Sequence, residues 1–463
     1  MNKNVYKVAM SFVLAFTVLI FYLTYISQFQ GPFLTTHPKN SRIWKVEEST
    51  IRGSIYDRNK EILVETNRQN IPERKYYLKE SAAHIMGYVS RKYGKTGIED
   101  YYDNYLLGIT GGVKYVNYFR RLVGKPPEGS NLYLTIDKSM QEEAYRMLDG
   151  RKGAVVAIDP QTGAVLALVS SPSYDSNSVS QQWEALNREE NSPLLNRATQ
   201  GLYPPGSVIK IAMAGGALTK NPNLWSQHFP NPGYIDVEGH RIHDTIIRTN
   251  PSMLEGIAYS SNVVFTNLAL ELGPEDFYTN LQNFYFNKSI PFILPIKKSY
   301  VIPPRKLTSS ALAQNGIGQG EMLVTPFHMA LITAAIANKG IMMEPYLVQK
   351  ITSPAGFTVF RNTTKDLAKP LEPEIAQLVT EGMTAVVDWG TGRNAQIPGV
   401  KVAGKTGSAQ NPNGISHAWF VGFAPADNPK IAVAVILENQ GAGGTQAAPI
   451  AKSLFNIALG RER

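Results

Sequence analysis

The chain has 463 residues, 43% of them apolar, and a formal net charge of +9, with 38 glycines, 29 prolines and no cysteine. Its length exceeds one ordinary domain, and its composition excludes a wholly disordered, collagen-like or coiled-coil protein. The missing cysteine excludes disulfides, thiolate metal ligands and a cysteine nucleophile. The positive charge forms no basic stripe, so it indicates mild attraction to an anionic surface or polymer and no nucleic-acid binding.

The first predicted element is an apolar segment from Val8 to Ile26, and no charged side chain occurs from Val8 to Pro38. At about 1.5 Å per residue this segment spans roughly 28 Å, close to the hydrocarbon core of a bilayer. Lys3 and Lys7 precede it, which places the N-terminal tail in the cytoplasm and the rest of the chain outside. A buried core helix would keep a polar side, and a cleaved signal peptide needs a small-x-small site that the following residues lack. We predict an uncleaved single-pass anchor over residues 1–27.

Residues 28–150 are predicted to form a β-rich pedestal, or dimerisation-like, domain after a Pro/Thr-rich spacer at Gly31–Pro38. In chain order we expect strands at 54–56 and 61–65, a helical stretch between 97 and 108, a strand at 133–136 and an amphipathic helix at 137–148. The two first strands flank a polar turn, in which we expect Asp57 and Arg58 to form an ion pair. Asp137 is placed to cap the helix that ends this domain.

The composition shifts at Gly150, so residues 151–463 are predicted to form a separate domain. Strands are expected at 153–158, 164–169, 418–423 and 431–437, and helices at 208–218, 253–272, 325–338, 373–387 and 447–459. The first two strands are joined by Asp159-Pro-Gln-Thr-Gly163, which predicts a hairpin. Strands near both ends with helices between them indicate an α+β fold, an antiparallel sheet packed by helices.

Chemistry is suggested first by Ser207 and Lys210, which follow a Tyr-Pro-Pro-Gly loop and open a predicted helix. Residues three apart share a helix face, so their side chains can meet. A serine hydroxyl becomes a nucleophile when a neighbour takes its proton, and a lysine among apolar residues can have its pKa lowered enough to do so. A helix N-terminus also directs amide N–H groups at a developing oxyanion. Ser207 is the only serine in the chain with a lysine three residues later.

Two further motifs follow: Ser260-Ser261-Asn262, the only Ser-x-Asn, and Lys405-Thr406-Gly407-Ser408 after a strand-like run at 400–403. A second Lys-Thr-Gly, at residues 95–97, precedes Ser207 and is interpreted as a decoy in a polar turn. Ser-x-x-Lys, Ser-x-Asn and Lys-Thr-Gly in this order are the set of serine β-lactamases and penicillin-binding proteins.

With these motifs the chain resembles the class B penicillin-binding proteins, the monofunctional peptidoglycan D,D-transpeptidases. The resemblance covers nearly everything after the anchor. Residues 52–59 are similar to the family's R-G-x-I-x-D-R-N-G block, with Lys60 in place of the glycine. Further similar blocks are found at 97–108, 153–174, 195–201, 316–320 and 417–423. Two departures, Ser261 in place of Asp and Ser408 in place of the commoner Thr, leave the expected hydrogen-bonding groups present.

The resemblance implies a serine penicillin-recognising transpeptidase fold that needs no cofactor or metal. The implied catalytic residues are Ser207, Lys210, Ser260, Asn262 and Lys405, and the implied substrate-binding residues are Thr406, Gly407 and Ser408, of which Thr406 and Ser408 bind the terminal carboxylate. By this resemblance Ser207 attacks the penultimate D-Ala carbonyl of a stem peptide, and Lys210 is its general base. Ser260 relays a proton to the departing D-Ala, and Asn262 holds the substrate amide and Lys210. The N–H groups of Ser207 and Ser408 form the oxyanion hole, Lys405 supplies positive potential, and β-lactam antibiotics acylate Ser207.

Alternative functions are a D,D-carboxypeptidase or β-lactamase, in which water is the acceptor, and an idle penicillin-binding scaffold or sensor. A sensor needs a large cytoplasmic effector, whereas only a short tail is predicted inside. Residues 28–150 are too few for a glycosyltransferase domain. The family analogy therefore implies a polytopic membrane glycosyltransferase as partner, which contacts the anchor and residues 40–130.

Four other patterns are interpreted as structural. Glu184, near Asn187, is interpreted as an exposed loop or helix residue, and Gly316-x-Gly318-x-Gly320 as a turn. His240, His243 and Asp244 are interpreted as a polar loop rather than a metal site. His328 is interpreted as a packed core histidine.

Overall fold

The computed structural model describes residues 3–26, 29, 41–67, 73–411 and 414–461, so the predicted spacer at Gly31–Pro38 lies outside the described residues. The apolar N-terminal segment forms α1 (Lys3–Tyr25). Its Asn4–Tyr25 stretch is long and apolar enough to cross a membrane, and none of it is buried against the protein. One N-terminal helix of this kind indicates a membrane anchor.

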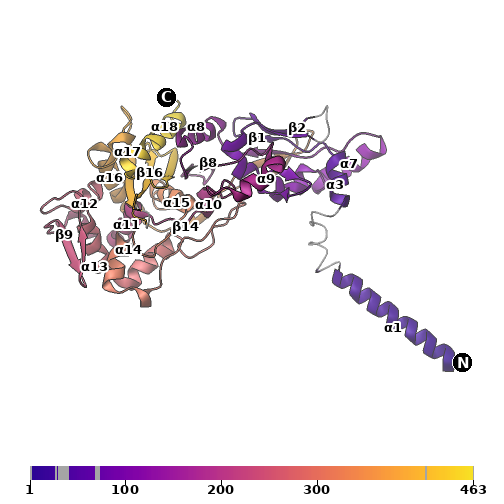
Figure 1. Cartoon of the computed structure of the whole chain (residues 1–463), viewed down its shortest axis with the longest axis horizontal. Coiled ribbons are helices and arrows are strands. Elements are labelled where there is room, and N and C mark those ends of the chain that lie inside the picture. Colours follow the sequence, from indigo (N-terminus) through magenta and orange to yellow (C-terminus); the bar gives the residue numbers. More distant parts are fainter. Residues whose placement is uncertain (1–2, 27–28, 30–40, 68–72, 412–413, 462–463) are drawn as a thin grey trace.

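A five-stranded antiparallel sheet forms the centre of the C-terminal body (Figure 1). Its strands, in spatial order, are β15 (Ala403–Ala409), β16 (His417–Ala424), β17 (Ile431–Leu437), β7 (Gly153–Ile158) and β8 (Val165–Ser171). All residues of β7, β8 and β17 are buried, because helices cover both faces. Their sequences are therefore continuous apolar runs without polar alternation. The predicted hairpin and α+β class are confirmed.

The two sheet faces belong to different hydrophobic clusters, since alternate residues of a strand point to opposite sides. Ala154 and Val156 pack with the helical side that includes α11 and α15, whereas Val155 and Ala157 pack with α8 and α18. These helices are α8 (Lys138–Leu148), α11 (Lys210–Lys220), α15 (Pro326–Ala337) and α18 (Ala448–Ala458). Asp137 caps α8 as predicted, by accepting from the N–H of Met140.

The predicted single helix over 253–272 is wrong, because the chain breaks between two helices there. α12 (Met253–Ala258) ends, and α13 (Asn262–Asn283) begins after a turn in which Ser260 has a φ of 61°. Ser252 and Glu255 form a capping box on α12, and Ser261 caps α13 by accepting from the N–H of Val264. Apolar periodicity continues across this break, so only the capping residues could have indicated it.

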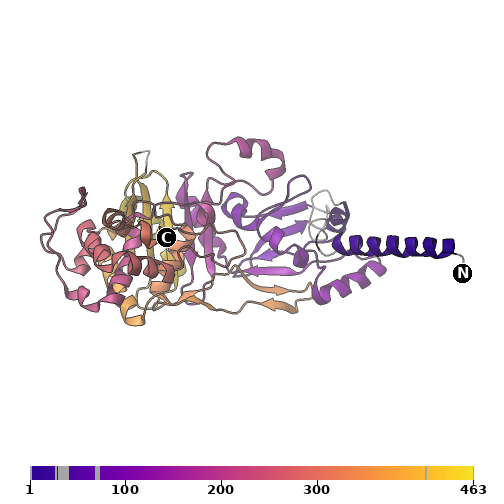
Figure 2. The ribbon, with the colours of Figure 1, turned by 90° about the horizontal axis from the view of Figure 1, so that it is seen from below.

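The pedestal sheet has the order β13-β12-β6-β1-β2-β3 and draws strands from distant parts of the chain (Figure 2). Its strands are β1 (Ile55–Tyr56), β2 (Ile62–Asn67), β3 (Glu73–Tyr76), β6 (Asn131–Leu134), β12 (Val348–Thr352) and β13 (Thr358–Arg361). β12 pairs antiparallel with β6, so residues 348–361 return across the boundary predicted at residue 150. In the other direction, α8 packs on the C-terminal sheet. Chain position alone therefore does not divide the two bodies.

The remaining elements connect these two bodies or extend from them. They are α3 (Ser41–Ser49), α4 (Ala83–Met86), β4 (Val89–Ser90), β5 (Gly94–Lys95), α5 (Gly97–Tyr101), α6 (Asp103–Leu106), α7 (Gly111–Leu122), α9 (Val179–Arg188), α10 (Arg197–Gln200), β9 (Tyr234–Val237), β10 (His240–His243), α14 (Ser309–Gly316), β11 (Met342–Met343), β14 (Asp366–Ala368), α16 (Pro373–Asp388), α17 (Gly443–Gln446) and 3₁₀ turns at Lys79–Ala82, Gly206–Ile209, Pro222–Ser226, Pro304–Lys306 and Arg393–Ala395.

A buried ion network holds the pedestal together. The Arg52 guanidinium, 3% exposed, contacts Glu99 at 2.6 Å, Asp103 at 2.5 Å and Glu47 at 3.1 Å. Arg74 contacts the second oxygen of Glu99 at 2.7 Å. Burial alone would raise the pKa of Glu99, but the two arginines hold it below its usual value. The charges are therefore mutually compensated, which a buried network requires.

The predicted ion pair between Asp57 and Arg58 is wrong. The buried Asp57 carboxylate instead accepts from the backbone N–H groups of Asn59 at 2.7 Å, Glu61 at 2.8 Å and Lys138 at 3.3 Å. An aspartate that bonds its own turn in this way is the usual means of shaping a tight reversal. The residue is structural, as expected, but through backbone contacts.

Replacing Arg52 by methionine should destabilise the pedestal by about 3–5 kcal/mol, because Glu99 and Glu47 would keep buried charges without a full complement of partners. Urea unfolding of the full chain, followed by tryptophan fluorescence, measures the loss. Arg91→Met is the matched control, since Arg91 is 72% exposed and pairs with the exposed Glu48. It should change the stability by no more than about 1 kcal/mol. Equal effects of the two variants would contradict a structural role for the network.

Candidate active site

Ser207 lies in the 3₁₀ turn Gly206–Ile209, and Lys210 is the first residue of α11. The turn contacts residues 317–320, which form the turn that follows α14; of the turn predicted at 316–320, Gly316 instead ends the helix. The N–H of Gly206 donates to the carbonyl of Gly318 at 2.8 Å. Gly206 has a φ of +54°, and a Cβ on Gly318 would lie 2.0 Å from the Gly206 oxygen. Both positions therefore require glycine if Ser207 is to keep its place.

The Lys-Thr-Gly-Ser segment lies beside the Ser207 turn. The prediction that it follows a strand at 400–403 is wrong, because these residues are within the edge strand β15. A Cβ on Gly407 would be 3.3 Å from the carbonyl oxygen of Pro205, so the loop and strand are in close contact. Trp419, on the neighbouring strand, donates from Nε1 to the carbonyl of Pro204 at 3.1 Å. The sheet therefore contacts the loop just before Ser207.

Lys210 is fully buried and its amine is surrounded by oxygen atoms. Nζ lies 2.8 Å from the carbonyl of Ser260, 2.8 Å from Oδ1 of Asn262 and 3.4 Å from Oγ of Ser260. It also lies 5.2 Å from the ring centroid of Phe265. The break between α12 and α13 thus presents carbonyl, hydroxyl and amide oxygens to a single amine.

Lys405 is also fully buried, and its Nζ donates to Oγ of Ser260 at 2.8 Å and to the carbonyl of Thr406 at 3.0 Å. The Ser260 hydroxyl therefore lies between two lysine amines. Burial lowers the pKa of Lys210 to about 7, against a smaller upward effect of Asp244. Burial, and then the proximity of Lys210, lower the pKa of Lys405 well below its usual value. With a pKa of about 7, Lys210 can gain and lose a proton near neutral pH.

The structure brings together four of the predicted catalytic residues: the amines of Lys210 and Lys405 contact the Ser260 hydroxyl, and Asn262 contacts Lys210. Ser207 is half-buried, and among the described residues no hydrogen bond joins its hydroxyl to the Lys210 amine; the backbone N–H of Lys210 bonds the Ser207 carbonyl. Ser408 is exposed, whereas Thr406 is buried with its hydroxyl 2.6 Å from that of Thr391. Thr391, in the loop after α16, was not predicted from the sequence.

Asp244 is a positioning residue that sequence reasoning did not identify. Its Oδ1 accepts from the backbone N–H groups of Asn262 and Val263, the latter at 3.0 Å. Its Oδ2 accepts from the Ser261 hydroxyl and from Nδ2 of Asn231, each at 2.6 Å. The carboxylate thus satisfies the first N–H groups of α13, where negative charge is favourable.

Asn262 is held from the same hairpin, since its Nδ2 donates to the carbonyl of His243 at 2.8 Å. Its Oδ1 is thereby turned towards Lys210. His243 and Asp244 had been considered only as a metal or loop pattern. Among the described residues no group of three potential ligands could hold a metal ion.

Three other interpretations concern residues away from this site. Lys95, in the second Lys-Thr-Gly, pairs with Glu47 and Asp103 in the pedestal. His328 is fully buried, its ring is 2.7 Å from the carbonyl of Phe284, and burial lowers its pKa to about 4. Glu184 is exposed on α9. These residues are structural or surface residues, as predicted.

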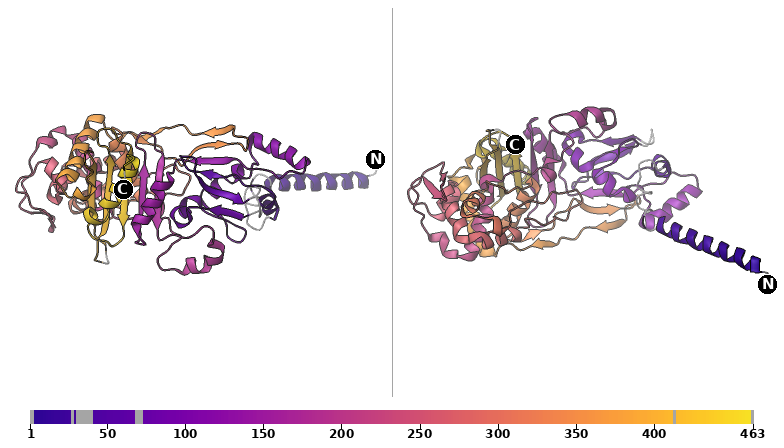
Figure 3. Two further views of the ribbon diagram at one scale, coloured as in Figure 1. Left: turned by 90° about the horizontal axis from the view of Figure 1, so that it is seen from above. Right: turned by 60° about the horizontal axis from the view of Figure 1, so that its bottom comes forward.

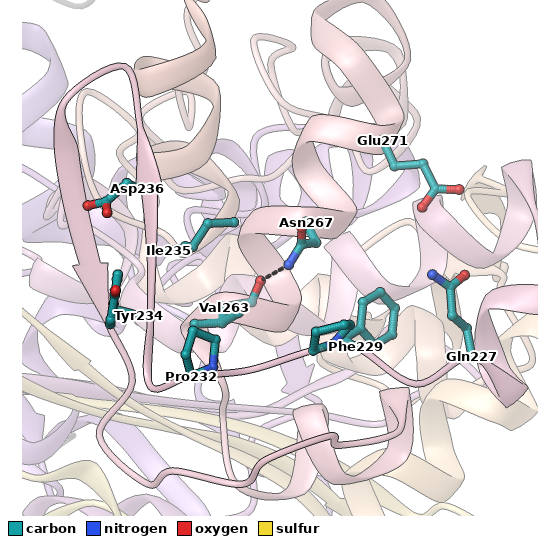
Figure 4. A pocket seen from close by; sticks show the side chains of 10 residues that line it. Gln227, Phe229, Pro232, Tyr234, Ile235, Asp236, Val263, Asn267 and Glu271 are labelled. Carbon is teal, nitrogen blue, oxygen red and sulfur yellow. Dashed lines mark hydrogen bonds between the residues drawn. The ribbon is translucent and has the colours of Figure 1, made fainter.

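A cavity of ≈ 570 Å³ lies between the β9–β10 hairpin and α13 (Figure 4). It is lined by Gln227, Phe229, Pro230, Pro232, Tyr234, Ile235, Asp236, Val263, Asn267 and Glu271. None of the predicted site residues is among them. The lysine cluster on α11 and β15 is therefore the site with an arrangement suited to chemistry, whereas this cavity offers no comparable set of converging charged groups.

The chain matches two families of known proteins. Residues 153–456 match the family described as "Penicillin binding protein transpeptidase domain". Residues 52–132 match the "Penicillin binding protein A dimerisation domain".

Named relatives span nearly the whole chain. The chain is 31% identical to the peptidoglycan D,D-transpeptidase PbpA of Mycolicibacterium smegmatis, over 99% of both proteins. It is 33% identical to the peptidoglycan D,D-transpeptidase MrdA of Acinetobacter baumannii, over 81% of this chain and 64% of the relative. Among solved structures, the imipenem acyl-enzyme complex of penicillin-binding protein A from M. tuberculosis is similar with a TM-score of 0.83 and 31% identity. The match covers 89% of this chain and all of that one.

Replacing Asp244 by asparagine should lower the free energy of unfolding by about 1.5–3 kcal/mol, because charge-assisted hydrogen bonds are lost and an NH₂ group would face the Asn231 donor. Chemical denaturation measures this loss. Asp236→Asn is the control in the same hairpin; its carboxylate is 47% exposed and pairs with Arg241, so its loss should cost about 1 kcal/mol or less. An Asp244 variant as stable as the control would contradict the positioning role.

Proposed function

Because the chain belongs to the class B penicillin-binding proteins and is a serine-type D-Ala-D-Ala transpeptidase of peptidoglycan synthesis, we propose that Ser207 is its acylated nucleophile. Lys210, Ser260, Asn262 and Lys405 are then the groups that move protons and charge around it. One observation carries this assignment. A fully buried lysine with a pKa of about 7 lies one 3₁₀ turn from Ser207 and within hydrogen-bond reach of the Ser260 hydroxyl.

Acylation begins when Ser207 attacks the penultimate D-Ala carbonyl of a stem peptide. Because burial lowers the pKa of Lys210 to about 7, its amine can be neutral near neutral pH. A neutral amine has a lone pair for the Ser207 proton, and contacts to Asn262 and to the Ser260 carbonyl keep the amine oriented. General-base catalysis is most effective with a pKa near the working pH.

The leaving D-Ala amine needs a proton, and Ser260 is placed to deliver one. Its hydroxyl accepts from the amine of Lys405 at 2.8 Å and lies 3.4 Å from that of Lys210. The proton taken from Ser207 can thus pass from Lys210 through the Ser260 hydroxyl to the leaving group. The Lys405 amine donates to the Ser260 oxygen and so keeps this hydroxyl oriented for the transfer.

Substrate contacts come from the edge strand β15. Alternate N–H groups of an edge strand have no partner strand and are free to bond a ligand. The N–H groups of Ser207 and Ser408 would stabilise the oxyanion, as preorganised donors do in acyl transfer. Gly407 allows the close approach of this strand to the Ser207 loop, and Thr406 and Ser408 bind the terminal carboxylate.

The acyl group then passes to an amine of a neighbouring stem peptide, which forms the cross-link. β-Lactams are substrate mimics that would stop at the acyl-enzyme. The similar M. tuberculosis protein has been solved as acyl-enzyme complexes with imipenem and penicillin G. We expect the same stable acylation here.

The membrane anchor and a membrane partner complete the proposal. Lys3 and Lys7 favour a cytoplasmic N-terminus and a single pass, with the catalytic domain outside the membrane. By family analogy, the glycan strands are polymerised by a partner, a polytopic membrane glycosyltransferase. The anchor and residues 40–130 are the segments available to contact it.

Fluorescent penicillin should label the full chain in detergent, and Ser207→Ala should remove the label completely, because the attacked oxygen would be gone. The exposed Ser226 provides a control: Ser226→Ala should label like the native chain. Gel fluorescence after denaturation measures the covalent product. Absence of label on the native chain would exclude an active enzyme, and rapid loss of label by hydrolysis would favour a β-lactamase.

The rate of penicillin acylation should fall as the pH drops below about 7, because protonated Lys210 cannot accept the Ser207 proton. Lys210→Arg should reduce the rate at least a thousandfold at every pH, since a guanidinium does not lose its proton. Stopped-flow measurement from pH 5.5 to 9 tests both statements.

The Asp244→Asn variant tests whether the acid limb of this pH profile reports the pKa of Lys210. Asp244 raises the pKa of Lys210, so its neutralisation should move the acid limb to lower pH. An acid limb that stays in place in both the Asp244 and Lys210 variants would assign it to another group.

A further inference from the structure

The helix α7 presents its apolar side to solvent. Val113 and Asn117, which share one side of the helix, are buried. The Asn117 side chain donates to the carbonyls of Gly108 and Glu128 and accepts from the N–H of Glu128. A surface helix normally buries its apolar residues and exposes its polar ones. In α7 a buried asparagine attaches the helix, so the usual arrangement is reversed.

The exposed side of α7 is here called the α7 face. It consists of Tyr115, Val116, Tyr118, Phe119, Leu122 and Val123, which are 57% to 69% exposed. At 100° per residue these positions fall within one arc of about 160°. A patch of this kind on an otherwise polar surface marks an interaction site.

A second segment extends the same surface. The tip of the β12–β13 hairpin carries Phe357, which is 76% exposed. Phe357 and Val359 line a groove of ≈ 540 Å³ together with Val116. The hairpin comes from a part of the chain more than two hundred residues beyond α7, so the fold has assembled this apolar surface from two separate segments.

The charges around the α7 face are mainly positive; Glu128, which also lines the groove, is paired with Arg120 at 2.7 Å. No Asp or Glu occurs between Thr110 and Lys125, whereas Lys114, Arg120, Arg121 and Lys125 do. On the helical arc Lys114 and Arg121 lie beside one edge of the α7 face and Arg120 beside the other. Aromatic and aliphatic residues bordered by basic ones are typical of a helix that lies in the interface of an anionic bilayer.

The anchor places this surface near the bilayer. The chain between Tyr25 and Ser41 can extend at most about 55 Å, so α3 cannot be farther than that from the end of α1. The segment that follows α7 contacts the residues after α3, because the N–H of Ile51 donates to the carbonyl of Pro127 at 2.9 Å. Figure 3 shows α7 at the pedestal end of the molecule, opposite the catalytic sheet.

We propose that the α7 face and the hairpin tip at Phe357 dock on the outer surface of the anionic lipid membrane that holds the anchor. This contact would give the pedestal a second attachment and fix the direction in which the catalytic domain extends from the membrane. A two-fold contact between copies is less favourable, because Lys114 and Arg121 of two α7 faces would be brought together, and the nearby Glu128 is already paired with Arg120.

The absence of cysteine from the chain makes a site-specific test possible, since one introduced cysteine is the only thiol. The full chain carries Leu122→Cys with an environment-sensitive fluorophore and is placed at one copy per lipid nanodisc. The discs contain phosphatidylcholine alone or with about one third phosphatidylglycerol, and spin-labelled lipid serves as quencher. Ser226→Cys, exposed in the catalytic domain, is the matched control.

In the anionic discs the label at position 122 should be quenched at least twofold more than the label at position 226, with a blue-shifted emission. The double variant Lys114→Gln, Arg121→Gln should weaken the docking of the α7 face on anionic lipid by about fivefold for each charge removed. The measured sign is a smaller difference in quenching at position 122 between anionic and neutral discs. Equal quenching at positions 122 and 226 in both lipids would overturn the proposal. A blue-shifted emission at position 122 that appears only with two copies per disc would also overturn it, because it would indicate self-association. The same holds for a blue shift that appears only after a partner membrane protein is added. Penicillin labelling of the same discs reports Ser207 separately, so failure of the docking surface is distinguishable from failure of the proposed catalytic role.

Discussion

The burial of two lysines is the constraint on which the active site depends. Lys210 and Lys405 are both fully buried, and each belongs to a different layer of the domain, a helix and an edge strand. Removing an ammonium group from water is costly, so the neutral amine is favoured and the pKa falls. The oxygen atoms of Ser260 and Asn262 compensate part of that cost while leaving the protons mobile. The same desolvation that destabilises the fold thus lowers the pKa of Lys210 to about 7.

The break between α12 and α13 is the second requirement, because it presents these oxygens. An unbroken helix would bond the carbonyls of Ser260 and Ser261 within itself. In the turn they instead reach the amine of Lys210, at 2.8 and 3.3 Å. Ser260 has a left-handed φ, which is unfavourable for a serine and is maintained by the caps on both sides. Asp244 completes those caps from a hairpin that has no catalytic motif of its own.

The pedestal and the catalytic domain are joined more closely than a simple two-domain chain would be. Residues 348–361 add two strands to the pedestal sheet, and one hydrophobic cluster extends from Ile55 through Leu134 to Leu168. The Thr135 hydroxyl donates to the carbonyl of Val165 at 2.7 Å, within the same junction. A contact made by the α7 face of the pedestal can therefore define the direction of the catalytic sheet.

The amino-acid sequence by itself determined the apolar anchor segment, the α+β class, the hairpin and the central strands, because these depend on local apolar patterns and turn residues. It also predicted Ser207, Lys210, Ser260, Asn262 and Lys405 as site residues, from three short motifs in a specific order. Only the tertiary structure decided what those residues contact. Three of these contacts join positions that are distant along the chain. Asp244 accepts from the N–H of Asn262, Gly206 donates to Gly318, and β12 pairs with β6 in the pedestal sheet. Such contacts leave no periodicity in the sequence, and the burial that lowers the lysine pKa values exists only when the layers have packed.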